Sequence, residues 1–425
     1  MPQHLREVGS RHPPLAVVVA LGAAAAVLVL AVLGGEDGAT RSSPPPSTAT
    51  PALPGPEDGS VDGATSAEEL RSAVVTALSE HLVLTDRLAR AGLRREQDLA
   101  ASADVALRRS SRTWQAALSN LGADASRSGE QASTGSLTAV FAYAAARAED
   151  DEEGAQDARA RVTGEMRRLS DVLIDAAGGA LEAGSTERGL QQYADGLVRH
   201  VDAGDRGDFV EAYEEERRTY AYSSQLGTVL ADGLSTGLGL PESAITPADR
   251  ARRYLERLLA EHAALALDVV AAHLRAGPDA PASAAALKAN GTELAWAVGQ
   301  GRGAVTAQFS RLWQRRVQAL VTYSGALAAD EQGVARDALV DVGRTSRQIV
   351  ALLESGRATP PGTLLPSLQQ QDQLLVRQAA DLAAADAPAA QRAFGEALDH
   401  GRELGSRVAE TLTGSPGDRA AAGAS

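Results

Sequence analysis

The sequence predicts an all-α protein, with two tandem antiparallel helical bundles after an N-terminal transmembrane helix and a disordered linker. Three observations support this fold class. The hydrophobic fraction of 44% rests on Ala and Leu with only 3% aromatic residues, whereas strands prefer β-branched and aromatic side chains. A long apolar run lies near the N-terminus, and the rest of the 425-residue chain carries an internal repeat.

The first expected element is a membrane anchor at residues 15–34. It opens with the unbroken apolar run LAVVVALGAAAAVLVLAVL, which at about 1.5 Å per helical residue nearly spans a hydrocarbon core of about 30 Å. Two arginines precede the run and Glu36-Asp37 follows it, so the positive-inside rule places residues 1–14 in the cytoplasm and the rest outside the cell membrane. The alternative is a signal peptide, whose cleavage would release a secreted protein.

Two segments are expected to be disordered. Residues 35–65 are rich in Pro, Ser, Thr and Gly, a composition that cannot bury a core, and we expect them to form a stalk. Residues 414–425, GSPGDRAAAGAS, are expected to form a disordered tail.

The folded part is expected to be a duplication, with one bundle over residues 66–238 and a second over residues 246–413. Matching segments recur in one order at a shift of 178 to 181 positions. The segment LQQYADGLVR matches LQQQDQLLVR, for example, and a Glu-His pair occurs in the first helix of each copy.

Start signals open the first helix of each copy. Ser66 has the capping-box spacing to Glu69, and Thr246 precedes a proline in the first turn. Helices with one apolar stripe bury it against one another, and the natural arrangement is an antiparallel bundle. Each copy is therefore expected to fold on its own.

Three segments carry a resemblance to a known family. They are His81 with Thr85, the run ANGTELAWAVG from Ala289, and the run GDRGDFVEAYEEERRTYAYSSQLGTVLADGL from Gly204. Together they resemble an uncharacterised family of bacterial helical-bundle proteins, found in many copies in spore-forming bacteria, with a His in the first helix and a GD-x-x-DF-x-x-AY…LAD-x-L last helix. The resemblance implies a helical fold in two tandem copies and implies no activity.

No motif predicts catalysis or nucleic-acid binding. Gly233-Leu-Ser235-Thr-Gly237 fits G-x-S-x-G, but a nucleophile elbow needs a strand before the serine and this segment follows a helical pattern. The Glu-x-x-His pairs of di-iron bundles are missing. The net charge of −14 repels nucleic acid. We therefore expect no enzyme activity, no cofactor and no nucleic-acid partner.

His81 and His262 are the candidate site residues. Each follows the apolar stripe of its helix and is expected to point into its bundle, with Tyr143 and Tyr323 as candidate hydrogen-bond partners. A structural role for both histidines is the favoured interpretation, with no metal bound. The alternative is one metal site in each repeat, built without cysteine, since the chain has none.

The tryptophans Trp114, Trp296 and Trp313 are expected to pack in the core or at an interface. The favoured function is a non-enzymatic, envelope-associated module that binds a protein or small ligand. The alternatives are a metal-binding envelope protein with one interior His site per repeat and the ectodomain of a sensory complex.

Overall fold

The computed structural model describes residues 64–94, 99–241, 245–300, 303–355 and 360–413. All regular secondary structure within these ranges is helical, so the predicted all-α class is confirmed. The first half contains α2 (Ala67–Arg94), α3 (Leu99–Leu118), the short 3-10 helix η1 (Ser119–Leu121), α4 (Ala123–Ala148), α5 (Glu152–Ala176), α6 (Ala183–Asp205) and α7 (Phe209–Gly237).

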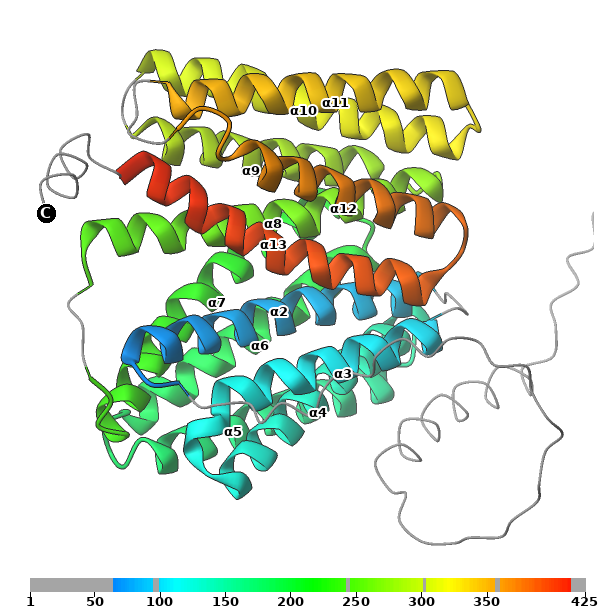
Figure 1. Cartoon of the computed structure of the whole chain (residues 1–425). Helices are drawn as coiled ribbons and strands as arrows, with labels where there is room; N and C mark the ends of the chain where they lie inside the picture. Colours follow the sequence, from blue (N-terminus) through cyan, green and yellow to red (C-terminus); the bar gives the residue numbers. More distant parts are fainter. Residues whose placement is uncertain (1–63, 95–98, 242–244, 301–302, 356–359, 414–425) are drawn as a thin grey trace, which may run out of the picture. The chain divides into compact units, whose positions relative to one another are not determined.

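The second half repeats this order of six α-helices (Figure 1). They are α8 (Pro247–Leu274), α9 (Ala280–Gly299), α10 (Gly303–Ala328), α11 (Gln332–Glu354), α12 (Leu365–Ala383) and α13 (Ala387–Thr413). In each half, the first helix packs along the last one, and consecutive helices pack as neighbours. Two antiparallel bundles with the same helix pairing are what a tandem duplication predicts.

The predicted segments 1–14, 15–34 and 414–425, and almost all of the stalk 35–65, lie outside the described residues. Among the helices that are described, none combines the length and the apolar character that a membrane span requires.

Helix starts follow local chemistry. The Thr246 hydroxyl accepts a hydrogen bond from the Asp249 amide while the Asp249 carboxylate accepts one from the Thr246 amide, so the predicted cap of α8 is confirmed. Asp208 caps α7, and Asp386 accepts from the Ala389 amide at the start of α13.

A glycine at matching positions sets the spacing between the first and last helix of each half. A Cβ at Gly227 of α7 would lie 2.9 Å from the Cα of Val75 in α2. A Cβ at Gly405 of α13 would lie 2.4 Å from the Cα of Glu256 in α8. Because only glycine permits this approach, both pairs of helices pack backbone to backbone at matching positions.

The two halves pack against each other within one compact unit and share one hydrophobic core cluster. Their contact is reciprocal, because α3 packs on α13 and α9 packs on α7. The second helix of each half therefore packs against the last helix of the other half.

The glutamates of the two Glu-His pairs lie buried at this contact. Glu80 is 1% exposed and lies 2.5 Å from Arg109 of its own half and 3.7 Å from Arg402 of α13. Glu261 is 2% exposed and lies 2.7 Å from Arg217 of α7. In each Glu-His pair, the His therefore lies inside its own bundle and the Glu contacts an arginine of the opposite half.

Candidate functional site

His81 lies in the interior of the first bundle, as its stripe position predicts. Its Nδ1 is 2.8 Å from the hydroxyl of Tyr193, and its Nε2 is 2.8 Å from Ser136 Oγ and 3.1 Å from the Ser133 carbonyl oxygen. Both ring nitrogens are engaged. Burial lowers the pKa of His81 to about 4, since the hydrogen bond to Ser133 opposes burial only in part.

His262 occupies the matching interior position of the second bundle with different neighbours. Arg316, itself fully buried, approaches His262 Nε2 with its Nη1 at 3.1 Å. Because arginine only donates, Nε2 accepts and Nδ1 donates to Asn290 Oδ1 at 3.2 Å. Asp372 accepts two hydrogen bonds from Arg316 and one from Ser346. Burial and the Arg316 charge lower the pKa of His262 to about 3.

Two predictions about the surroundings of these histidines are wrong. Tyr143 donates to Asp202 at 2.6 Å and does not contact His81, whose partner is Tyr193 on α6. Asn290 and Arg316, rather than Tyr323, hold the His262 ring.

The tryptophan prediction holds for two of the three residues. Trp114 and Trp313 are buried, and the Trp313 ring packs edge-on against His262. Trp296 is 66% exposed on α9, so it does not pack in the core, and its predicted place at an interface stays a prediction.

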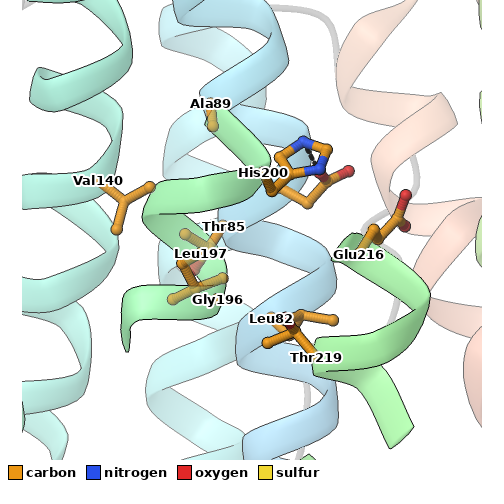
Figure 2. Close-up of a pocket in the computed structure, with 10 residues that line it drawn as sticks. Leu82, Thr85, Ala89, Val140, Gly196, Leu197, His200, Glu216 and Thr219 are labelled. Carbon is orange, nitrogen blue, oxygen red and sulfur yellow. Dashed lines mark ion pairs between the residues drawn. The ribbon is translucent and has the colours of Figure 1, made fainter. Parts of the chain in front are cut away.

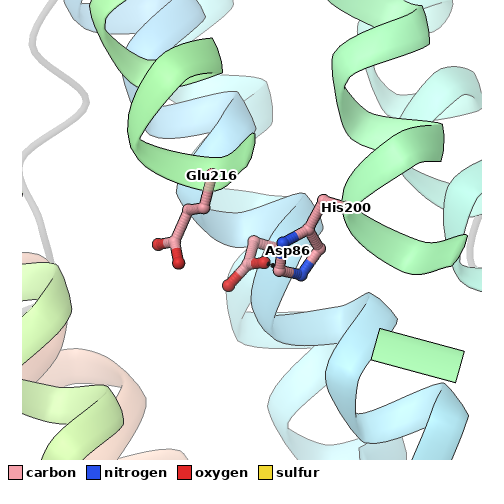
Figure 3. A group of neighbouring side chains, drawn as sticks. All are labelled: Asp86, His200 and Glu216. Atoms are coloured by element: carbon pink, nitrogen blue, oxygen red, sulfur yellow. Dashed lines mark ion pairs between the residues drawn. The ribbon is translucent and has the colours of Figure 1, made fainter. Parts of the chain in front are cut away.

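The structure brings three metal-ligating side chains together at a place where the sequence pattern predicts none. Asp86 of α2, His200 of α6 and Glu216 of α7 each present one ligand atom, and these atoms lie within 4.8 Å of one another (Figure 3). All three residues are buried. Within the described part of the chain, no comparable group contains His81 or His262.

A glycine allows α6 and α7 to approach at this place. A Cβ at Gly196 would lie 2.3 Å from Thr219 Oγ1, so any larger residue would separate the two helices. Gly196 and Thr219 line a cavity of about 10 Å³ together with all three ligating residues (Figure 2). That volume has room for about one water molecule.

The tautomer of His200 is fixed by the backbone. Its Nδ1 lies 2.9 Å from the Ala212 carbonyl oxygen, which can only accept, so Nδ1 carries a proton. Its Nε2 faces Asp86 Oδ1 in direct ion-pair contact. Neither oxygen of Asp86 makes an aligned hydrogen bond, although both lie in ion-pair contact.

Arg90 supplies positive charge to the same cluster. Its Nε lies 2.9 Å from Asp86, and its Nη atoms contact Glu216 and, at 3.3 Å, Asp268 of α8. Its guanidinium also stacks on the ring of Tyr213. Because Asp268 belongs to the second half, Arg90 connects the cluster to the contact between the halves.

The pKa values of the carboxyl groups in the cluster shift in opposite directions. Burial opposes ionisation of Asp86, but the charges of Arg90 and His200 outweigh it and lower the pKa to about 2. Burial, together with the neighbouring Asp86 charge, raises the pKa of Glu216 well above its usual range. Burial likewise raises the pKa of Asp268. One acid of the cluster is thus ionised and its neighbours hold protons more tightly.

The sequence pattern shows His200 as a histidine without a counterpart, because Gln378 stands at the matching position of the second half. That asymmetry is the signal from which the site could be found. Asp86 and Glu216 show the same asymmetry, because Leu267 and Phe394 stand at their matching positions, but no spacing along the chain groups these two acids with His200.

No model of a protein family matches the sequence, and neither a curated protein nor a solved structure is significantly similar to it.

Proposed function

We propose that this chain is a single-pass membrane protein with an extracytoplasmic module of two duplicated helical bundles, and that the module acts by binding. The main observation in support of this topology is the unbroken apolar run from Leu15 to Leu33, which has arginines before it and acids after it. The Pro-rich segment 35–65 then acts as a spacer between the membrane and the bundles.

The duplication is supported by more than sequence matches. Both halves have six α-helices in the same order, the same helices pair, and the glycine contacts of Gly227 and Gly405 recur. The likeness to the bacterial helical-bundle family agrees with this arrangement.

Binding rather than catalysis is supported by the interior of the bundles. The G-x-S-x-G serine, Ser235, lies within helix α7, is 1% exposed and donates to the Ala231 carbonyl oxygen. The cavity at Asp86 and an apolar cavity of about 20 Å³ beside Trp313 each have no more room than a water molecule or two would need. Small-molecule sites measure about 300–1,000 Å³. A large ligand would therefore bind an outer surface.

Topology can be tested with single cysteines, because the chain has none of its own. A V340C variant places a thiol at a side chain that is 58% exposed on α11, and a Q3C variant places one before the apolar run. A membrane-impermeant maleimide should label V340C in intact cells and Q3C only after lysis. The reverse pattern would refute the proposed orientation, and a soluble product that begins after residue 33 would refute the anchor.

A further inference from the structure

Two buried carboxyl groups of the Asp86–His200–Glu216 cluster lie close enough to repel each other. Arg90 contacts Asp86, Glu216 and Asp268, and Arg87 adds positive charge near Asp86 and Asp268. The Asp86 charge still opposes ionisation of Glu216. A divalent cation bound between the two carboxylates would remove this repulsion.

The ring of His200 has the orientation that is typical of a metal-bound histidine. A metal-bound imidazole usually donates its other N–H to a backbone carbonyl or carboxylate, which fixes the ring and its tautomer. His200 donates from Nδ1 to Ala212 and turns Nε2 toward Asp86 and the neighbouring cavity. The cavity offers room for one water as a fourth ligand.

We propose that Asp86, His200 and Glu216 bind one divalent transition-metal cation, with Zn²⁺ as the best fit. One imidazole and two carboxylates suit Zn²⁺ and Mn²⁺, whereas Mg²⁺ and Ca²⁺ prefer sites made of oxygen alone.

Arg90 remains compatible with a bound cation because it has other partners. Its guanidinium contacts Asp268 and the hydroxyl and ring of Tyr213, none of which is a proposed ligand. Asp268 therefore neutralises Arg90 while the cation neutralises Asp86 and Glu216.

The second half shows which residues the site requires. Leu267, Gln378 and Phe394 stand at the positions that match Asp86, His200 and Glu216, and Leu374 stands where the first half has Gly196. All the ligands and the glycine that makes room for them are missing together. The chain is therefore expected to bind one cation and not two.

This inference goes beyond the proposed binding module and does not depend on membrane topology. It is tested by calorimetric titration of Zn²⁺ into the metal-free full-length chain in detergent. We expect one equivalent to bind, more tightly than Mn²⁺ and far more tightly than Mg²⁺.

Two ligand variants and one matched control locate the site. His200→Gln introduces the residue that occupies the matching position of the second half, and Asp86→Asn keeps the side-chain shape. Each should raise the Kd for Zn²⁺ at least tenfold. His400→Gln should not, because His400 is as buried as His200 but its acidic contact is the single, half-exposed Glu403.

If a ligand variant fails to fold, a measurement on the unmodified chain still tests whether the metal site exists. Co²⁺ added to the unmodified chain should give visible absorption bands of a low-symmetry nitrogen and oxygen site, and Zn²⁺ should abolish them. The proposal is overturned if the unmodified chain shows neither stoichiometric Zn²⁺ binding nor Co²⁺ bands, or if folded His200→Gln binds Zn²⁺ unchanged.

Discussion

The interior imidazoles couple protonation to folding. His81 accepts a proton in the unfolded chain near its ordinary pKa of 6.5, but in the fold only near pH 4, because burial opposes its charge. Between these values the unfolded chain binds more protons than the folded one. Acid therefore favours unfolding in this window, and the stability contributed by a neutral His81 is complete only above pH 6.5.

This coupling can be isolated with His81→Gln. The free energy of unfolding of the original chain, minus that of the variant, should fall by about 1.4 kcal/mol per pH unit as the pH drops from 6.5 to 4. Urea unfolding followed by circular dichroism at several pH values measures the difference. A difference that stays constant with pH would mean that folding does not hinder protonation of His81.

The Arg316–Asp372 pair should behave as one buried unit. Removal of either partner leaves an uncompensated charge inside the second bundle, so Arg316→Met and Asp372→Ala should each cost about 3–5 kcal/mol. The double variant should cost clearly less than the sum, because no lone charge remains. Denaturant titration of the four proteins gives the coupling energy, and simple additivity would contradict a buried pair.

The stripe pattern predicts where these histidines point but not what they touch. The spacing of apolar residues along one helix is local information, and it correctly places His81 and His262 inside. Their partners come from other helices, and Tyr193 lies 112 residues away from His81 in the chain. The choice of Tyr193 over Tyr143 depends on how α6 is rotated against α2, which no local pattern specifies.

The packing of α6 against α7 depends on a single small residue, Gly196. Gly196→Ala would bring a methyl group within 2.3 Å of Thr219 Oγ1, and we expect a loss of about 1–3 kcal/mol in unfolding free energy. Thermal and chemical denaturation measure it. Thr219→Ala in the same chain should restore part of the loss, because it removes the clashing atoms.

Gly164→Ala is the matched control for that substitution. Gly164 lies inside α5, and a methyl group added there would meet no atom within 4 Å, so alanine should stabilise the helix by about 0.5–1 kcal/mol. Equal effects of the two substitutions would show that helix propensity, and not the α6–α7 contact, determines the result at Gly196.

Helix α9 shows why the sequence pattern does not predict the exposure of Trp296. The helix is rich in alanine and has few charged residues, so apolar side chains occur on all its faces. Leu294, Ala295 and Val298 form the buried side near its end, while Trp296 faces outward. A helix without a polar face gives no sequence signal for which side meets the core.

In the whole molecule, the contact between the halves is too polar to be recognised from the sequence. Glu80 and Glu261 resemble surface charges beside an interior histidine, yet both are buried beside arginines of the opposite half. The expectation that each copy folds alone rests on local signals, which do not include this contact. Given the contact, we expect each isolated half to be helical but less stable than the full chain.

Co-expression tests this dependence. Residues 64–241 and 245–413, produced as separate chains, should associate in a 1:1 complex that is more thermostable than either half, by size exclusion and melting. R217E in the first half should abolish association, because it places a third carboxylate beside Glu261 and Glu293.

The control for this charge reversal is R344E, at an arginine that is 60% exposed on α11 and pairs with Asp341 across one helical turn. It should leave the complex intact. Halves that stay monomeric when mixed, or an R217E half that still associates, would show that the interface contributes little to assembly.

The reciprocal contact between the halves has a consequence for how such a protein diversifies. A surface that offers the same helices to its copy is one that two identical subunits could share, and in such a homodimer every substitution appears twice. Covalent linkage of the subunits removes this constraint. Two acids, Asp86 and Glu216, can then arise in one half while the other half keeps Leu267 and Phe394 for packing. The two halves can thus specialise and still remain in a fixed one-to-one ratio.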